Sequence, residues 1–294
     1  MNILITGSEG FIGKKLTSKL VLKHDVFTFD QIESNEHLSK KHFVGDVLEI
    51  NSIAEIEDPV EVIFHFGSAS SVRSFAGKEE ELSNKEIQSF ISALEFARSK
   101  KVRRFIYPST ASIYTFDSQR GRNIVNPSNI YAATKFTEEH LASLYSKYFD
   151  TVGLRIFMVY GPGEEGKGER ASPITLFIED ILKGKSPVIY GDGTQTRDAL
   201  FVDDLVDVLN NMLQVEEKAG VYDVCTGHAI SFNEILSIIS KIKGDIISPT
   251  YIPRPKSYVE GTPGNPEFTL KLLGRKLTSI EKGIEKLYDY LSNR

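Results

Sequence analysis

Short apolar runs alternate with longer amphipathic segments through the first half of the chain. The apolar runs have the size of buried strands, and between them apolar positions recur every three to four residues, as they do in helices. This pattern predicts strands at 3–6, 26–30, 42–45, 60–65, 105–107 and 151–156, and helices at 11–22, 82–99 and 129–148. Such alternation favours right-handed crossovers and a parallel sheet covered by helices on both faces.

The pattern changes after residue 160. The polar, glycine-rich segment 161–170 is expected to form a loop, either a plain surface loop or a mobile lid. Beyond it we expect short helices at 173–183, 203–213, 231–243 and 279–291, short strands near 187–190, 221–224 and 249–252, and a long loop that contains Pro253, Pro255, Pro263 and Pro266. This mixture predicts a second, smaller α/β lobe.

Three glycines, Gly7, Gly10 and Gly13, follow the first predicted strand. Glycines allow a sharp turn and the close approach of a pyrophosphate, which the free N–H groups of a helix N-terminus bind. Asp30 ends the second predicted strand, where a carboxylate accepts hydrogen bonds from an adenine ribose. The strand, turn and helix context predicts a dinucleotide site. A tight turn without a ligand, and an ordinary strand-end acid, are the alternatives.

Ligands of doubly wound sheets bind beyond the carboxyl ends of the strands. Residues expected at or just past such ends, and therefore at one crevice, are Gly7, Asp30, Asp46, Phe66, Gly67, Ser68, Ser109, Thr110 and Phe157. We therefore predict an α/β fold in two parts. Residues 1–160 form a dinucleotide-binding Rossmann domain with a doubly wound parallel sheet. Residues 161–294 form mainly a smaller C-terminal α/β substrate lobe, with some segments returning to the first domain.

Composition narrows the class of protein. The 294 residues are 40% hydrophobic and 26% charged, with a net charge of −5, which argues against a nucleic-acid partner. The single cysteine, Cys225, permits no intrachain disulfide and fits a reducing, cytoplasmic location. We expect no membrane span, because no apolar run is long enough. The six histidines show no ligand spacing, so we expect no metal site.

Tyr131 and Lys135 are the central candidates for chemistry. Residues four apart share a helix face, and a nearby cation favours the tyrosine phenolate, which suits a general acid and base. Thr110, at the end of the fifth predicted strand, would hydrogen-bond to the substrate oxygen whose proton Tyr131 takes. A turn or cap threonine is the alternative for Thr110.

These motifs together resemble the extended short-chain dehydrogenase/reductase family, the nucleotide-sugar epimerases and dehydratases. The matching segments cover nearly the whole chain and are Gly7-x-x-Gly10-x-x-Gly13, Asp30, Asp46-Val47, residues 65–69, Asn84, 108–114, Tyr131-x-x-x-Lys135, 154–163, 191–198, 202–204 and 222–227. The resemblance implies NAD as the cofactor and a nucleotide-diphosphate sugar as the substrate.

The resemblance also implies roles for single residues. Cofactor contacts would come from Gly7, Gly10, Phe11, Ile12, Gly13, Asp30, Asp46, Val47, Phe66, Gly67, Ser68, Tyr131 and Lys135. Substrate contacts would come from Thr110, Ser112, Tyr131, Met158, Arg197 and Arg254. Thr110, Tyr131 and Lys135 would be catalytic. Arg197 and Arg254 would clamp the diphosphate, with surface salt bridges as the alternative.

Departures from the family pattern bear on the reaction. Ala111 and Ser112 stand where dehydratases of the family carry acids, and Met158 stands where many members have asparagine. We therefore predict NAD-dependent C4 epimerisation, in which Tyr131 removes the hydroxyl proton while hydride passes to NAD and returns to the other face of the keto-sugar. An NAD(P)H-dependent 4-keto-sugar reductase is the alternative, because it shares every catalytic residue. A non-catalytic dinucleotide sensor would predict a broken catalytic set.

The helices at 82–99 and 129–148 carry more apolar residues than one face requires. These are Leu82, Ile87, Phe90, Ile91, Leu94 and Phe96 on the first, and Tyr131, Phe136, Leu141, Leu144, Tyr145 and Tyr148 on the second. The surplus predicts a second buried face, and in the resembled family these helices often pair across a twofold axis. We expect a homodimer, with packing inside a monomer as the alternative.

Overall fold

The chain folds into two compact, interleaved units. The computed structural model describes residues 1–36, 38–52, 59–117, 119, 122–215, 219–254, 261 and 263–294. Unit 1 comprises Met1–Arg155 and Leu209–Tyr222, and unit 2 comprises Ile156–Val208 and Asp223–Arg294. The assignment of the cofactor to one part of the chain and the substrate to the other stays a prediction.

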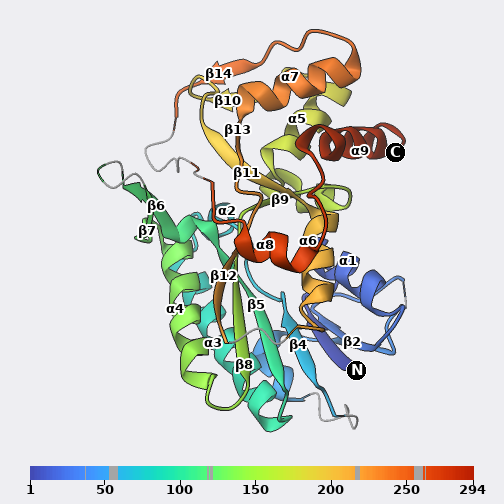
Figure 1. The fold of residues 1–294 in the computed structure, drawn as a ribbon, viewed down its shortest axis with the longest axis vertical. Coiled ribbons are helices and arrows are strands. Elements are labelled where there is room, and N and C mark those ends of the chain that lie inside the picture. Colours follow the sequence, from blue (N-terminus) through green and yellow to red (C-terminus); the bar gives the residue numbers. More distant parts are fainter. Residues whose placement is uncertain are drawn as a thin grey trace. The chain divides into compact units, whose positions relative to one another are not determined.

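A seven-stranded sheet is the centre of unit 1 (Figure 1). Its order is β12 (Gly220–Val224), β8 (Asp150–Ile156), β5 (Arg104–Thr110), β4 (Val62–His65), β1 (Asn2–Thr6), β2 (Asp25–Asp30) and β3 (Lys41–Val44). Strand β1 pairs in parallel with both β2 and β4, β2 with β3, and β4 with β5. The strand order therefore reverses next to β1, which confirms the predicted doubly wound parallel sheet. Ligands of such sheets bind at the reversal point.

Helices cover both faces of this sheet. On one face, α3 (Glu79–Ser99) and α4 (Ile130–Tyr145) pack with Leu4, Phe27 and Phe105 in one hydrophobic core. Because neighbouring side chains of a strand point to opposite faces, Ile3 and Ile5 lie on the other face, the one that α1 (Phe11–Leu20) covers. The shorter elements of unit 1 are η1 (Val47–Ser52), α2 (Val72–Phe75), η2 (Ala111–Ile113) and the antiparallel hairpin of β6 (Tyr114–Asp117) and β7 (Arg122–Val125).

Unit 2 is built from small sheets and helices around its own core. Strand β11 (Thr196–Phe201) pairs in parallel with β9 (Met158–Tyr160) and antiparallel with β13 (Ala229–Ser231), and β10 (Val188–Tyr190) pairs with β14 (Thr250–Ile252). The helical elements are η3 (Glu164–Arg170), α5 (Pro173–Leu182), α7 (Phe232–Lys243), α8 (Glu267–Leu273) and α9 (Ile280–Ser292), and α6 (Val202–Asn211) runs from unit 2 into unit 1. Apolar side chains of α5, α7 and α9 share one core with Tyr160 and Phe201.

Most longer elements begin and end within a few residues of the predicted positions, but one expectation needs correction and one helix was missed. Segment 161–170 is not a plain loop, because η3 fills most of it. Buried Glu164 accepts hydrogen bonds from the Ser172 N–H and from the hydroxyls of Ser172 and Thr175, and so joins η3 to the start of α5. Helix α8, which was not predicted, begins directly after Pro266, the last proline of the predicted long loop, and Pro255 of that loop lies outside the described residues.

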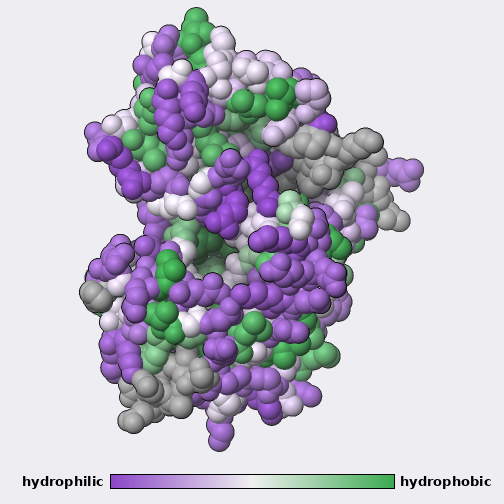
Figure 2. All heavy atoms as spheres, turned by 180° about the vertical axis from the view of Figure 1, so that it is seen from behind, coloured by the Kyte–Doolittle hydropathy of each residue, from purple (hydrophilic) through white to green (hydrophobic). Residues whose placement is uncertain are grey.

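The apolar surplus on α3 and α4 is used mainly inside unit 1. Phe90, Leu94 and Phe96 belong to the core, while Ile91, Leu144 and Tyr148 stay exposed. The surplus therefore gives less support to a second buried face than the sequence pattern indicates, and the homodimer stays a prediction. As a separate observation, hydrophilic residues predominate on the face of the molecule drawn in Figure 2, and hydrophobic residues form small separate groups there.

Candidate active site

The glycine-rich turn after β1 is shaped by two positions where only glycine fits. Gly7 has a φ of +69°, and a Cβ there would collide with the Phe66 carbonyl group. A Cβ on Gly13 would collide with the Gly7 carbonyl oxygen. Gly10 differs, because a Cβ there would meet only the Gly7 oxygen, at 3.2 Å. Gly10 is exposed at the N-cap of α1 and provides no side-chain cap, so the helix N-terminus has the access that a pyrophosphate requires.

The carboxylate of Asp30, the last residue of β2, is held next to this turn. It accepts hydrogen bonds from the Glu9 N–H at 2.9 Å and from the Ile32 N–H at 3.4 Å. These bonds leave acceptor positions on its oxygens, as a ribose ligand requires. The turn's own acid, Glu9, is paired with Lys14 at 3.1 Å, which offsets a negative charge next to a pyrophosphate site. The residues present therefore fit a dinucleotide.

Asp46 lies between β3 and η1, and Val47 is the first residue of η1. Gln31 donates to the Asp46 carboxylate at 2.9 Å and Lys85 pairs with it at 2.7 Å. Burial opposes the charge, but the hydrogen bonds from Lys85 and the Leu48 N–H hold the pKa of Asp46 below its ordinary value. Val47 is buried, and its Cγ2 would lie 3.0 Å from a Cβ on Gly67, so the segment after β4 passes directly beside it.

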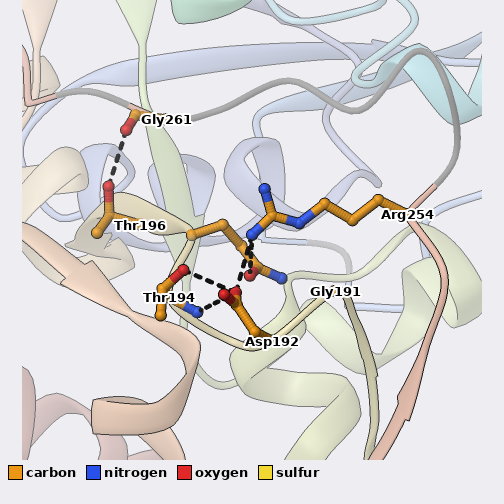
Figure 3. A pocket seen from close by; sticks show the side chains of 7 residues that line it. Gly191, Asp192, Thr194, Thr196, Arg254 and Gly261 are labelled. Carbon is orange, nitrogen blue, oxygen red and sulfur yellow. Dashed lines mark hydrogen bonds and ion pairs between the residues drawn. The ribbon is translucent and has the colours of Figure 1, made fainter.

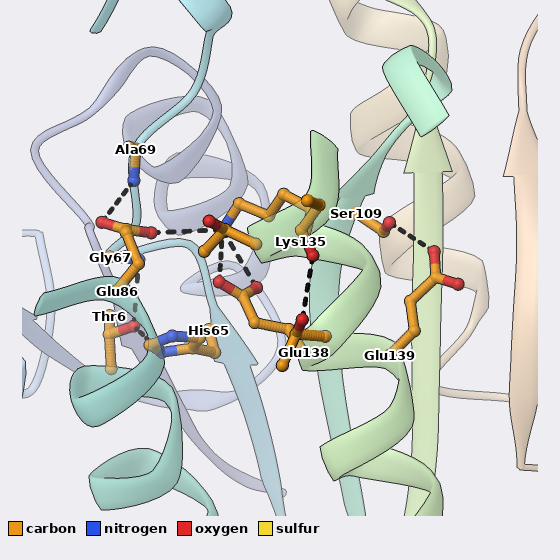
Figure 4. A network of polar contacts seen from close by, with 12 residues as sticks. Thr6, His65, Gly67, Ala69, Glu86, Ser109, Lys135, Glu138 and Glu139 are labelled. Carbon is orange, nitrogen blue, oxygen red and sulfur yellow. Dashed lines mark hydrogen bonds and ion pairs between the residues drawn. The ribbon is translucent and has the colours of Figure 1, made fainter. Parts of the chain in front are cut away.

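The segment after β4 is fixed by the residue that ends β1. The Gly67 N–H donates to the Thr6 hydroxyl oxygen at 3.2 Å, and the same hydroxyl is 2.9 Å from Nδ1 of buried His65 (Figure 4). Burial, and then the charge of Lys135, lower the pKa of His65 to about 3, so this histidine is neutral. Phe66, Gly67 and Ser68 are each partly exposed, as residues that line a ligand must be. Of the two cofactor contacts that were predicted on α1, Phe11 is buried and Ile12 is half-buried.

Thr110 and Tyr131 are brought together at the end of β5. Both are buried, and their side chains share a hydrogen bond. The Thr110 hydroxyl oxygen also accepts the Ser112 N–H at 3.1 Å, which makes Thr110 the N-cap of η2. The cap interpretation and the catalytic interpretation are therefore compatible. Ser112 itself is half-buried.

The electrostatics of Tyr131 differ from the expectation. Burial raises the pKa of its hydroxyl above the ordinary value, and this effect exceeds the lowering by Lys135 and by the Thr110 hydrogen bond. The charges of Glu138 and Glu86 raise the pKa further. The expected effect of Lys135 on the tyrosine is therefore present, but it does not decide the net direction.

Lys135 is buried and forms ion pairs with two carboxylates. Its Nζ lies 3.0 Å from both oxygens of Glu138 and 3.2 Å from Glu86, which also accepts the Ala69 N–H at 3.0 Å (Figure 4). Burial lowers the pKa of Lys135, but the charges of Glu138 and Glu86 more than compensate and raise it overall. Burial raises the pKa of Glu138, against the lowering effect of Lys135.

Sequence reasoning missed these two carboxylates. Glu138 could have been found, because it lies three residues after Lys135 on the same helix face. Glu86 could not, because it comes from α3, 49 residues away in the chain. A neighbouring network was missed too: the Ser109 hydroxyl donates to Glu139, and Arg155 donates to Glu139 and to the Tyr114 hydroxyl.

Unit 2 contains a pocket of its own. Its cavity of about 480 Å³ is lined by Gly191, Asp192, Thr194, Gln195, Thr196, Arg254 and Gly261. Arg254 extends along it and donates to Asp192 at 3.0 Å and to Gln195 at 3.3 Å (Figure 3). Arg254 is therefore ion-paired with Asp192, which is the salt-bridge alternative expected for it, and an anionic ligand in this pocket would compete with that carboxylate for the guanidinium.

Arg197 and Met158 are the other predicted substrate contacts in unit 2. The Arg197 guanidinium lies over the Phe232 ring at 5.5 Å, and its Nη1 donates to the Thr196 carbonyl at 2.7 Å. The neighbouring Thr196 side chain is bonded to Gly261, because its hydroxyl donates to the Gly261 carbonyl at 2.8 Å. Met158 is half-buried in β9 and packs against the core of unit 2.

Among the described residues, no helix combines the length and apolar character that a membrane crossing requires.

Comparison with known proteins matches the chain to nucleotide-sugar epimerases. The chain is 29% identical over 250 residues to a putative UDP-glucose 4-epimerase of Methanocaldococcus jannaschii, with 81% of each chain covered. The solved UDP-glucose 4-epimerase of Thermotoga maritima, with UDP-glucose, superposes with a TM-score of 0.89 at 25% identity and covers 100% of this chain and 99% of its own.

A second solved structure has the cofactor bound. The UDP-glucuronic acid 4-epimerase of Bacillus cereus, in complex with UDP-glucuronic acid and NAD, superposes with a TM-score of 0.84 at 26% identity, covering 100% of this chain and 99% of its own. The model of the NAD dependent epimerase/dehydratase family matches residues 3–225, which include the glycine-rich turn, Asp30 and the Tyr131–Lys135 pair. With this match over most of its length, the chain belongs to the NAD dependent epimerase/dehydratase family.

Proposed function

We propose that this enzyme is a C4 epimerase of a nucleotide-diphosphate sugar. The observation that carries the proposal is the group formed by Thr110, Tyr131 and Lys135: a buried tyrosine hydroxyl, hydrogen-bonded to a threonine hydroxyl, with a buried ammonium group one helical turn away. The relatives at 29%, 25% and 26% identity are named as 4-epimerases and support the same reaction.

In this mechanism Tyr131 handles the proton of the sugar 4-hydroxyl. Its phenolate accepts the proton when the sugar is oxidised to the keto form, and the resulting phenol returns a proton when the sugar is reduced. Thr110 orients the reacting oxygen by a hydrogen bond. When bound, NAD supplies a hydride acceptor and a positive charge. The buried position of Tyr131 excludes bulk water from the proton that it carries.

We assign the cofactor to residues 1–160 and the substrate mainly to residues 161–294. The glycine-rich turn, Asp30, Asp46 and the segment 66–68 would hold NAD, and Lys135 would donate to its ribose. The polar pocket of unit 2, with Arg254 inside it and Arg197 nearby in the sequence motif 191–198, suits the diphosphate end of the substrate. Met158 and Ser112 are the proposed contacts to the sugar.

The absence of acids after Thr110 separates this chain from the dehydratases. Ala111 and Ser112 provide no carboxyl group for proton transfer beyond C4. A one-way 4-keto-sugar reductase would use the same three catalytic residues, but the similar proteins named above are epimerases and do not favour it. A non-catalytic sensor is disfavoured because Thr110, Tyr131 and Lys135 are all present.

The experiment is a panel of UDP-, dTDP-, GDP- and ADP-sugars incubated with the enzyme, with and without added NADH or NADPH. We expect one or more 4-epimers to form without net consumption of the added dinucleotide. Tyr131→Phe should lower turnover by about 10²–10⁴-fold while NAD still binds, because only the ionisable oxygen is lost. Stoichiometric NADH oxidation, or near-normal turnover in Tyr131→Phe, would reject the proposal.

We also propose that the enzyme works as a homodimer. The exposed apolar side chains of the α3–α4 surface, Ile91, Leu144 and Tyr148, support this arrangement. A twofold interface places the same surface of each copy against the other, so each of these side chains contributes apolar area to the interface from both copies.

A further inference from the structure

The buried ammonium of Lys135 lies between the carboxylates of two glutamates. An ammonium has three N–H donors. Three carboxylate oxygens, two from Glu138 and one from Glu86, lie within 3.0–3.2 Å of Nζ. The side chains of Lys135 and Glu138 are each 2% exposed and that of Glu86 is 11% exposed, so water screens these charges poorly.

The charges in this group do not cancel. Lys135 contributes one positive charge, while Glu86 and Glu138, when both ionised, contribute two negative charges. Tyr131 therefore experiences a lysine whose field is reduced by its own partners. The pKa of the tyrosine reflects this, because Lys135 lowers it and both glutamates raise it.

We propose that Glu138 is a positioning residue for Lys135, and that with Glu86 it reduces the positive charge that Tyr131 experiences. The two glutamates come from different helices, α4 and α3, and hold the ammonium from both sides (Figure 4). Glu86 also accepts the Ala69 N–H, which connects the lysine to the segment that follows the predicted cofactor-lining residues. This inference rests on the proposed function, in which Tyr131 is the acid and base.

Other titratable groups near Tyr131 and Lys135, namely His65, Glu139 and Tyr107, do not reduce the positive charge at Tyr131 as the two glutamates do. His65 on β4 is neutral, as its lowered pKa shows, and its imidazole contributes no charge. Glu139 on α4 is compensated by Arg155, at 2.7 Å. Tyr107 on β5 stays protonated, because burial, followed by the charges of Glu139 and Glu138, raises its pKa. The position of the Lys135 ammonium, and the electric field that it exerts on Tyr131, therefore depend on Glu86 and Glu138.

The test measures the titration of Tyr131 in the NAD-loaded protein. Tyrosinate absorbance is recorded against pH, and the signal of the matching Tyr131→Phe protein is subtracted to isolate this tyrosine. Glu138→Gln keeps the size of the side chain and removes its charge. Glu80→Gln is the matched control, because Glu80 lies on α3 but is exposed. We expect the titration midpoint of Tyr131 to fall by about 0.5–1 pH unit in Glu138→Gln.

Glu86→Gln should shift the midpoint in the same direction by a smaller amount, and Glu80→Gln should leave it in place. The acidic limb of the pH profile of kcat/KM for the accepted sugar should move with this midpoint. At pH values below the midpoint, kcat/KM should therefore rise about three- to tenfold in Glu138→Gln. An unchanged or higher midpoint in folded Glu138→Gln would overturn the inference. If that variant does not fold, an unchanged midpoint in Glu86→Gln would overturn it.

The two proposals fail in different ways. A protein that shows the expected shift of the Tyr131 midpoint but epimerises no nucleotide sugar would contradict the proposed function and leave the role of Glu138 standing. A protein that epimerises normally, with the same midpoint in wild type and Glu138→Gln, would contradict the role of Glu138 and leave the proposed function standing.

Discussion

Asp30 is a single side chain on which the choice of dinucleotide depends. Its carboxylate is fixed by the N–H groups of Glu9 and Ile32, so it cannot turn away from a 2′-phosphate without losing both bonds. NAD should therefore bind more tightly than NADP, by about tenfold or more, because like charges at close range repel. Isothermal titration calorimetry with both dinucleotides measures the ratio. Asp30→Ala should reduce it, and equal affinities in the wild type would contradict this role.

His65 makes the stability of the protein depend on pH. Its pKa is lowered from 6.5 to about 3 in the folded protein. Between these values the unfolded chain binds one proton more than the folded chain, so the free energy of unfolding falls as the pH falls through this window, by about 1.4 kcal/mol per pH unit. Urea unfolding of wild type and His65→Asn at pH 6.5, 5.5 and 4.5 measures the difference. The wild type should lose more stability on acidification, and parallel losses would contradict the prediction.

Residue-scale prediction from the sequence depended on whether partners are close in the chain. Tyr131 and Lys135 are four residues apart, so their proximity followed from helix geometry alone. Whether the pKa of Tyr131 rises or falls depended on its burial and on Glu86, which reaches the lysine from α3. Neither effect can be read from the residues next to Tyr131 in the chain, and so the predicted lowering of its pKa was wrong in its net direction.

At the scale of the β1–α1 element, two glycines of the same motif should behave differently. A Cβ on Gly13 would collide with the Gly7 carbonyl oxygen, so Gly13→Ala must distort the turn. A Cβ on Gly10 meets only one atom, at 3.2 Å, so Gly10→Ala should fold normally but obstruct the pyrophosphate. Thermal melts with and without NAD distinguish the two. We expect a lower melting temperature for Gly13→Ala, and for Gly10→Ala a near-native melting temperature without the NAD-induced increase.

If instead Gly10→Ala gained as much stability from NAD as the wild type does, the turn would not be the pyrophosphate site. Gly166→Ala serves as the control, because a Cβ there meets no atom within 4 Å. It should match the wild type with and without NAD.

The elements that the sequence predicted correctly are those with a clear pattern of hydrophobic residues. The buried strands of unit 1 are continuous apolar runs, and α7 carries both an amphipathic stripe and a capping box between Ser231 and Glu234. The short elements had no such signal. The η3 helix lies in a segment of glycines and charges, and it is fixed by Glu164, whose burial depends on α5 and cannot be read from its neighbours.

At the scale of the whole molecule, we expect a dimer of twice the 32.9 kDa chain mass at micromolar concentration, measured by light scattering. Leu144, 67% exposed on α4, is the side chain to change. Leu144→Glu should yield monomers, because it puts a charge into each half of a twofold interface. Leu22→Glu, at a site 76% exposed after α1, is the control and should stay dimeric. A wild-type monomer, or a dimer in Leu144→Glu, would contradict the proposed interface.

Transfer of the C4 hydrogen to the cofactor and back is the central claim of the proposed function. The measurement is epimerisation of the accepted nucleotide sugar carrying deuterium at C4, in ordinary water, followed by NMR and mass spectrometry of both epimers. We predict that deuterium stays at C4 in the product, with no exchange with solvent and no accumulation of free reduced dinucleotide. Replacement of the label by solvent hydrogen, or conversion only with stoichiometric NADH or NADPH, would contradict the account.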